Sequence, residues 1–587
     1  MTARSSGSST QPVAHSFYVW VKAEPFSYGT LSIPPPPRLS TNCIKKSLAY
    51  AKNKGELGFP RISYTVWRHI ACNKIHLPED LAWLYFSTCH LLSENTSPAE
   101  RIEWSQCFAK CKTSQDKESL KNHLTVNTYK FVLYLYIQQF NKVSLKASLV
   151  AGDGWPTSSA YHDSDSKVNR RLKAMDEHSH LGFVQSHLME MLELLIDPEN
   201  RTAAAATISS SSSPCLGRDL QVSHDILTAL GFLISASADK CRTTIGLAEL
   251  LQLPGVKSKI CYSKSTQSVP IQSLYYWLKE NLIPNPFGPS ACASSGRRLS
   301  WRMLGEDPRN ENNFKRGRIA TNAHIVSKEA IKGNKVIFMS QVSKQTVARS
   351  SATLENSNIK IHRCHGSNLY LLAPLRSVTV QKCRHSKIVL GPVETSVHIE
   401  NCEFVTVIAP CHRIVINSSQ LCTLHLLTPN QPVILNGNDS VVLAPYHTHY
   451  PKLEEHMARV GLESNCNLWD QPLCLGSDHK ESAPVWELMK LEDFFIFNIP
   501  FEMEGSTKTA PYVLPQGYKD IITHRQRSVI TWQKLVKDAK LSPDQIKEFQ
   551  EVIETHFCIW LTENGHKREL ENLALPPQNP TSVQATH

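Results

Sequence analysis

The chain has 587 residues, of which 41% are hydrophobic and 20% are charged, and its formal net charge is +11 at pH 7. This length is too great for one core, so we expect two to four domains in an ordinary globular protein. No secretion signal opens the chain and no apolar run reaches membrane-spanning length, which argues against secreted and membrane-spanning proteins. The 17 cysteines are therefore expected to be reduced thiols in the cytosol or nucleus.

The N-terminal half is predicted to be mainly helical. Residues 1–14 are rich in serine and threonine and are expected to be a disordered tail. Residues 15–288 form the helical region, which a low-complexity loop of alanines and serines interrupts at 199–218. Apolar residues at three-and-four spacing predict helices at Asp80–Leu92, Val126–Phe140 and Val184–Asp197, more weakly at Ile44–Lys52, and again between Asp219 and Leu282.

A basic segment follows, and residues 289–334 are predicted to be a basic linker. Between Arg297 and Arg349 we count 12 basic and 4 acidic residues, so this stretch carries 12 − 4 = +8 of the whole charge. Such a stretch could bind nucleic acid, phospholipid or the acidic tails of tubulin, but a solvated linker is the simpler interpretation. Nucleic acid is an improbable partner because no aromatic ladder, RNP motif or zinc-finger spacing accompanies the charge.

An internal repeat occupies the chain from Ser357 to Pro445. A phrase of two apolar residues, a small residue and proline recurs, and its prolines are 18, 18, 19 and 16 residues apart, by subtraction of their numbers. An apolar-x-apolar phrase also recurs once in every repeat. Each repeat is therefore predicted to hold two short strands. The prolines are Pro374, Pro392, Pro410, Pro429 and Pro445, and the apolar pairs begin at Ile359, Val378, Val397, Ile414 and Val433.

These repeats predict a parallel β-helix at 335–447, with one coil per repeat. A unit this short cannot bury its own apolar face, whereas stacked coils make a continuous core and pair every strand. Prolines at 374, 392, 410 and 429 are expected at successive equivalent corners, where no ladder donor is lost. A β-sandwich is the alternative, but it explains the strand spacing without explaining the recurring proline corners.

The C-terminal part is predicted to be a β-helix extension at 448–510, a helical pair at 511–574 and a disordered tail at 575–587. Ser542, Pro543 and Gln545 mark the start of the second helix as N-cap, first-turn proline and capping-box glutamine. Apolar residues follow on one face of this helix, among them Ile546 and Ile553. That face is expected to be core, docked on the β-helix or on a partner helix.

We expect no metal and no cofactor. Cys364, Cys383 and Cys402 recur once per coil, 19 residues apart, with histidines nearby. Zinc sites need short paired spacings, whereas a cysteine column one strand spacing apart is ordinary filling of a coil corner. No phosphate-binding glycine loop, His-Glu-x-x-His or Gly-x-Ser-x-Gly motif occurs.

The repeats, the Pro451 that follows them and the downstream sequence Asn467 to Asp470 resemble the tubulin-binding cofactor C domain family. That resemblance implies the cofactor C-like β-helix, in which relatives use an arginine to stimulate GTP hydrolysis by tubulin or a small GTPase. The matching stretch here keeps the glutamine as Gln420 but has Cys422 at the arginine position, and a thiol lacks the fixed positive charge of a guanidinium. Arg413 could substitute only if its side chain faced the same groove.

The resemblance therefore implies a non-enzymatic scaffold or adaptor rather than an enzyme. It implies a role in the cytoplasm at the centrosome and spindle pole, in centrosome positioning and Golgi organisation, with effects on cell shape and migration. Expected partners are proteins: tubulin, a small GTPase or centrosomal proteins, met through Gln420, Cys422 and His425. The alternative is a GTPase-activating protein for tubulin or an Arf-like GTPase.

Overall fold

The structure is a computed structural model of the whole chain, and it falls into two compact units. One unit contains 1–95, 113–297 and 321–336, and the other contains 96–112, 298–320 and 337–587. The described residues are 17–141, 165–196, 220–238, 244–299, 317–322, 335–349, 352–476, 479, 484–507 and 509–563. The predicted tails at 1–14 and 575–587, the loop at 199–218 and the end of the helical pair at 564–574 lie outside them.

The first unit is mainly helical, as the sequence predicts, but it also holds a small sheet. Strand β1 (Tyr18–Val21) pairs antiparallel with β5 (Ile234–Ser237) and parallel with β7 (Leu282–Ile283). Two antiparallel ribbons join β2 (Arg61–Ser63) to β3 (Thr125–Asn127) and β4 (Gln221–Ser223) to β6 (Ser268–Pro270). The helices are α1 (Glu24–Ser27), α2 (Thr41–Asn53), α3 (Tyr64–Arg68), α4 (Glu79–Ser93), α6 (Ser114–Asn122), α7 (Thr128–Ile137), α9 (Asp165–Leu195), α11 (His224–Leu230), α12 (Leu247–Leu250), α13 (Pro254–Lys257), α14 (Ile271–Asn281) and α15 (Pro289–Ser295), with a π-helix at His69–Ile75.

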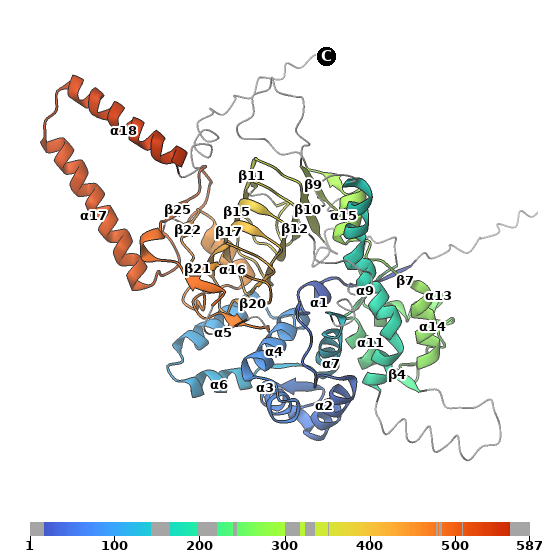
Figure 1. The fold of residues 1–587 in the computed structure, drawn as a ribbon. Coiled ribbons are helices and arrows are strands. Elements are labelled where there is room, and N and C mark those ends of the chain that lie inside the picture. Colours follow the sequence, from blue (N-terminus) through green and yellow to red (C-terminus); the bar gives the residue numbers. More distant parts are fainter. Residues whose placement is uncertain are drawn as a thin grey trace, which may run out of the picture. The chain divides into compact units, whose positions relative to one another are not determined.

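The second unit is built around a parallel β-helix, which confirms the predicted fold (Figure 1). Each coil contributes one strand to each of two facing sheets, so the strands of one sheet alternate in sequence with those of the other. One sheet contains β10 (Val336–Ser340), β12 (Asn358–His362), β14 (Ser377–Gln381), β16 (Val397–Glu400), β18 (Ile414–Asn417), β20 (Val433–Ile434) and β23 (Leu473–Cys474). The other contains β11 (Thr346–Arg349), β13 (Asn368–Leu371), β15 (Arg384–Leu390), β17 (Glu403–Pro410), β19 (Thr423–Leu427), β21 (Val441–Pro445) and β24 (Trp486–Leu488).

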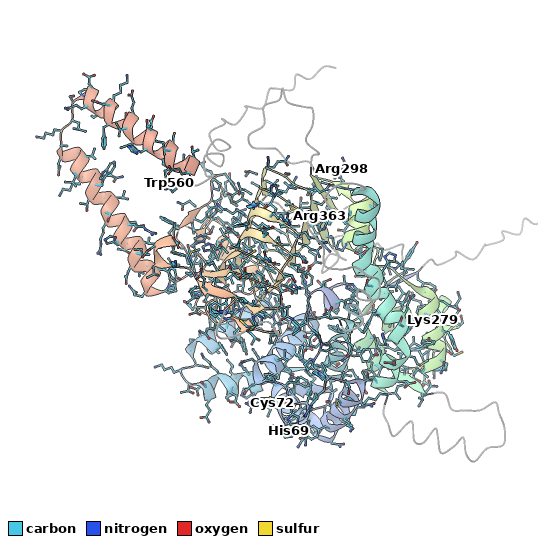
Figure 2. The ribbon with its side chains drawn as sticks, viewed as in Figure 1. His69, Cys72, Lys279, Arg298, Arg363 and Trp560 are labelled. Atoms are coloured by element: carbon cyan, nitrogen blue, oxygen red, sulfur yellow. The ribbon has the colours of Figure 1, made fainter. Side chains whose placement is uncertain are left out.

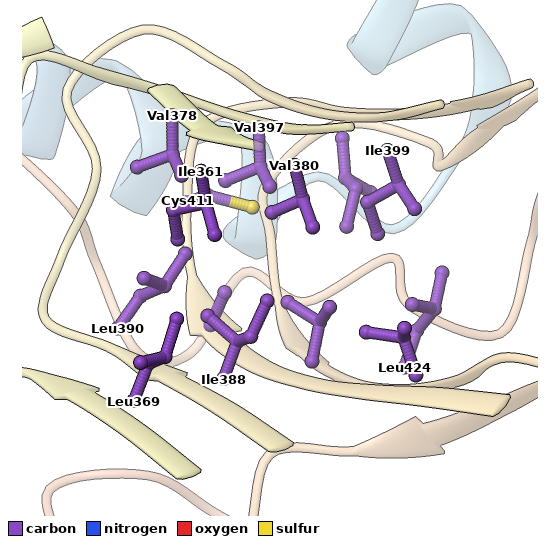
Figure 3. Packing of buried hydrophobic residues seen from close by; sticks show 14 of the residues in the cluster. Ile361, Leu369, Val378, Val380, Ile388, Leu390, Val397, Ile399, Cys411 and Leu424 are labelled. Carbon is purple, nitrogen blue, oxygen red and sulfur yellow. The ribbon is translucent and has the colours of Figure 1, made fainter. Parts of the chain in front are cut away.

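The two sheets bury alternate side chains against each other. In β14, Val378 and Val380 are 0% exposed while Thr379 between them is partly exposed, because successive side chains in a strand point to opposite faces. Figure 3 shows these valines pointing toward Ile388 and Leu390 of the opposite sheet. Each fully buried aliphatic side chain contributes about 1.5–3 kcal/mol, so the stacked interior dominates the stability of this unit.

The proline corners are confirmed for three coils and wrong for the fourth. Pro374, Pro392 and Pro410 each precede one member of a continuous column of parallel bridges, which runs from residue 375 through 393 to 411. Pro410, however, pairs with Leu427 rather than with Pro429. The coil from residue 407 to 424 is two residues shorter than the coil from 388 to 407, so it carries Pro429 two residues past the corner.

The described part of the basic segment is folded. Strands β8 (Arg297–Arg298) and β9 (Arg318–Thr321) extend the sheet of β10 by two strands, and α15 precedes them. This differs from the linker predicted at 289–334, because strands at a sheet edge pair through backbone groups, which a count of charged side chains does not reveal. Residues 300–316 and 323–334 lie outside the described residues.

One helix from the N-terminal half belongs to the β-helix unit. Helix α5 (Pro98–Lys110) packs on α16 (Leu453–Val460), and the side chain of its Arg101 lies 3.2 Å from the carboxylate of Glu394. Arg376 contacts the same carboxylate at 3.0 Å, so two guanidinium groups share one largely buried glutamate. The predicted helical region at 15–288 gave no sign of this division, because it rests on a contact between residues about 290 positions apart.

The chain ends in two long helices, α17 (Gln516–Asp538) and α18 (Pro543–Glu563) (Figure 1). The Ser542 hydroxyl accepts a hydrogen bond from the Gln545 amide while the Gln545 side chain accepts one from the Ser542 amide, which confirms the predicted capping box. Between these helices and the β-helix lie β22 (Thr448–His449), β25 (Phe497–Asn498) and a short 3-10 helix at Leu491–Asp493.

Candidate partner-binding face of the β-helix

The candidate site is a row of residues at one corner of the β-helix, where each coil turns from the first sheet into the second. Parallel bridges connect six residues, one per coil, into a continuous column. We call this column and the residue after each of its members the corner face. The column consists of Ser343, His365, Arg384, Glu403, Gln420 and Asp439, and the residues that follow are Lys344, Gly366, His385, Phe404, Leu421 and Ser440.

The second row of the corner face has a left-handed backbone. All six of its residues have φ between 46° and 58°, a range in which the backbone of any residue other than glycine is strained. Glycine occupies only one of these positions, Gly366. The chain instead places Phe404 and Leu421 there, with φ values of 52° and 51°. Both side chains point outward from the turn, because the residues before and after each of them belong to the backbone of the coil.

The corner face combines apolar and polar groups. Phe404 is 45% exposed and Leu421 is 44% exposed, on neighbouring coils. The Phe404 ring stacks on the imidazole of His385 with centroids 4.8 Å apart. Beside them, Arg384 Nε lies 3.1 Å from Glu403 Oε2, an exposed ion pair of small energetic value. Exposed apolar groups fixed by a rigid scaffold and bordered by charges are typical of a protein-binding surface.

The structure separates the three residues that the sequence predicts for partner binding. Gln420 is exposed and belongs to the corner face. Cys422, two residues later, is 0% exposed and points into the core, where burial raises the pKa of its thiol to about 12. Its Sγ donates to the carbonyl of Gln420 at 3.3 Å. Cys422, the residue predicted to stand at the arginine position, therefore faces the interior of the coil.

His425 lies on the outer side of the second sheet, beneath the C-terminal extension. Its ring stacks on that of His447 with centroids 3.7 Å apart, and Phe494 packs beside both rings. Burial lowers the pKa of His425 to about 4 and that of His447 to about 2, with the nearby Lys387 adding to both shifts. Both imidazoles are therefore neutral at physiological pH and act as packing groups.

Arg413 lies on the opposite end of strand β18 from Gln420 and is 3% exposed. Burial is the main cause that lowers the pKa of His398, to about 3, and the positive charge of Arg413 lowers it further. A buried guanidinium at the other end of the strand cannot reach a partner at the corner face. The corner face does present one exposed arginine, Arg384, in the same column as Gln420 but two coils before it.

The cysteine column matches the interpretation as core filling. Cys364, Cys383 and Cys402 occupy equivalent positions in successive coils, and each is at most 2% exposed. In the part of the chain that the structure describes, no group of three or more His, Cys, Asp or Glu side chains is arranged to hold a metal ion. Within the same residues, no helix is both long and apolar enough to cross a lipid bilayer.

Comparison with known proteins agrees with this architecture. The sequence profile of the family Tubulin binding cofactor C matches residues 356–473, which contain most coils of the β-helix. TBCC domain-containing protein 1 of Rattus norvegicus is 42% identical over 563 residues, 95% of each chain. The chain belongs to the TBCC domain-containing protein 1 family. The Homo sapiens relative is 42% identical over 562 residues (95% of this chain, 97% of the relative), and the Danio rerio relative 39% over 582 (98% and 96%).

For this member of the TBCC domain-containing protein 1 family, similarity extends over both compact units and is not confined to the β-helix. The sequence alone missed Phe404 and His385 as surface residues. Their signal is weak but present: each lies two residues after a column cysteine, where a regular coil turns. Recognising them required the left-handed backbone, because a phenylalanine next to an apolar strand otherwise reads as core.

Proposed function

We propose that this protein is a non-catalytic scaffold that binds a protein partner through the corner face of its β-helix. It acts in the cytoplasm at the centrosome and spindle pole, where it regulates centrosome positioning and Golgi organisation and thereby cell shape and migration. The observation that carries the absence of catalysis is the inward Cys422, which supplies no cation where relatives use arginine. A buried thiol cannot neutralise charge that develops on a transferred phosphoryl group.

Binding and catalysis draw on different contacts, so the loss of one does not remove the other. The exposed Phe404 and Leu421 supply apolar area, and the column from Arg384 to Asp439 supplies hydrogen-bonding groups. Tubulin, an Arf-like small GTPase and centrosomal proteins are the partner candidates that the family suggests.

The first test is single-turnover GTP hydrolysis by tubulin and by Arf-like GTPases, with this protein in excess. We expect hydrolysis to stay within about threefold of the intrinsic rate, whereas an arginine finger gives about 10³–10⁵-fold stimulation. Stimulation of about a hundredfold or more would overturn the scaffold assignment and support the alternative, a GTPase-activating protein. Loss of that stimulation in Arg384→Ala would identify the one exposed arginine of the corner face as the finger.

The second test measures binding and localisation. The Phe404→Ala/Leu421→Ala double variant should lose partner pull-down and centrosomal localisation, and cells that carry it should show displaced centrosomes and dispersed Golgi membranes. Leu57→Ala, which removes a side chain 64% exposed in the other unit, is the matched control and should behave as wild type. Normal localisation of the double variant would contradict the corner face as the binding surface.

A further inference from the structure

The C-terminal helices carry apolar side chains that the described part of their unit leaves exposed. On α17, Val529 is 53%, Trp532 is 49% and Leu535 is 63% exposed. On α18, Val552 is 51%, Phe557 is 46% and Ile559 is 50% exposed. So much apolar surface on two neighbouring helices exceeds the scattered exposed residues of a typical monomer and marks an interaction site. Figure 2 shows side chains standing out along both helices.

The base of α17 is firmly attached. Tyr518 packs its ring on Phe494 with centroids 4.7 Å apart and donates a 2.6 Å hydrogen bond to the Met489 carbonyl. Arg525 lies over the ring of Phe495, 4.0 Å from its centroid. The same three-and-four spacing continues through Val529 and Trp532, so the attached face of the helix continues as the exposed apolar face.

The two helices touch each other only near their connection. The rings of Trp532 and Phe549 have centroids 5.9 Å apart. Figure 1 shows the two helices diverging away from their connection. Each helix, moreover, has apolar residues on two adjacent lines. On α18, Ile546, Ile553 and Phe557 form one line, and Val552 and Ile559 form another, about 130° around the axis at 3.6 residues per turn. One partner helix cannot cover both lines, whereas a helix in a four-helix bundle meets two neighbours.

The charges of the helices identify the other two helices of such a bundle. Between residues 516 and 538, α17 has five basic and two acidic residues, a net charge of 5 − 2 = +3. Between residues 543 and 563, α18 has one basic and five acidic residues, a net charge of 1 − 5 = −4. A second copy of this chain therefore offers an acidic helix to α17 and a basic helix to α18, in a two-fold symmetric contact.

We propose that two copies of this protein dimerise by interlocking α17 and α18 into a four-helix bundle, with α17 of each copy against α18 of the other. The first test is sedimentation of the full chain over a range of concentrations. We expect a dimer whose dissociation constant rises at least about tenfold in Ile553→Glu/Phe557→Glu, because each glutamate would be buried without a counter-charge. Leu57→Glu, at a side chain 64% exposed in the other unit, should leave the dimer unchanged. A wild-type monomer at every concentration would overturn the proposal.

A charge exchange separates contact between copies from closure within one chain. Lys519 and Lys537 border the apolar face of α17, beside Ile530, and Glu548 and Glu554 border that of α18, by the same 3.6-residue geometry. Lys519→Glu/Lys537→Glu alone and Glu548→Lys/Glu554→Lys alone should each weaken the homodimer, because like charges then meet. Mixed together, the two variants should form a heterodimer, since both α17–α18 contacts regain opposite charges.

If the helices instead close on each other within one chain, or bind a different protein, mixing the two variants produces no heterodimer, and the proposal fails. Because all four residues are exposed, neither variant should disturb the fold of the β-helix, which circular dichroism checks independently.

Discussion

The β-helix and the C-terminal helical pair use similar apolar residues with opposite results. In the β-helix, Val380, Ile388 and Val407 are 0% exposed, because each coil is covered by the coils before and after it and by the opposite sheet. On α17, Ile530 and Leu535 are each 63% exposed, and on α18 Val552 is 51% exposed. Periodic apolar spacing therefore identifies which face of a strand or helix has to be buried. Whether the same chain supplies the cover depends on whether neighbouring elements stack.

The largest expected effect comes from breaking the stacked core. Val380→Asp should unfold the β-helix, because it buries a charge without a counter-charge among aliphatic side chains, at a cost of about 4 kcal/mol or more. Thr379→Asp, one residue earlier and partly exposed, should leave the unit folded. Thermal denaturation followed by circular dichroism distinguishes them, and equal melting temperatures would contradict the assigned inward face.

The next effect tests the position that matches the family arginine. Cys422→Arg should destabilise the β-helix by about 3 kcal/mol or more, because the site is 0% exposed and cannot hydrate a guanidinium. Gln420→Arg, on the exposed corner face, should be nearly neutral. Urea titrations of both variants give the comparison, and a stable, soluble Cys422→Arg protein would show that this side chain can turn outward.

A smaller effect concerns pH. Burial depresses the pKa of His425 to about 4 and of His447 to about 2, below the unfolded value of about 6.5. The unfolded chain then binds more protons than the folded chain below about pH 6.5, so the free energy of unfolding should fall with falling pH, by at most about 1.4 kcal/mol per pH unit for each such histidine. The stabilisation is complete above about pH 6.5.

His447→Phe should flatten this pH dependence between about pH 6.5 and 4 while keeping an aromatic ring on His425. His524→Phe on α17 is the control, since that residue is exposed, and its profile should match wild type. Denaturant midpoints over this pH range provide the measurement. An unchanged slope in His447→Phe would mean that other groups cause the acid sensitivity.

The smallest expected effect concerns the N-terminal cap of α18. Ser542→Ala removes the capping box of α18 and should cost about 1 kcal/mol of helix stability. Because α18 adds little to the β-helix core, the melting temperature of the whole chain should not change, whereas hydrogen exchange at the first amides of α18 should accelerate. A global loss of stability would show that α18 packs on the body of its unit.

Much of the fold could be predicted because its signals are local or strictly periodic. The apolar-x-apolar phrases indicated the strands of each coil, and Ser542 with Gln545 indicated the start of α18. Predictions failed where spacing changed or contacts were distant: Pro429 left its column because one coil is two residues shorter, and helix α5 joined the β-helix unit through the distant Glu394.

From the sequence alone the parallel β-helix could be predicted, because stacking buries the apolar faces of a short repeat and the recurring prolines favour coils over a β-sandwich. The sequence also places Cys422 where the resemblance to the family leads us to expect an arginine. Where that position points could be seen only in the folded chain, because a single left-handed residue, Leu421, turns Gln420 outward and Cys422 inward. The backbone direction at such a corner is set by the coils above and below it, which no local pattern encodes.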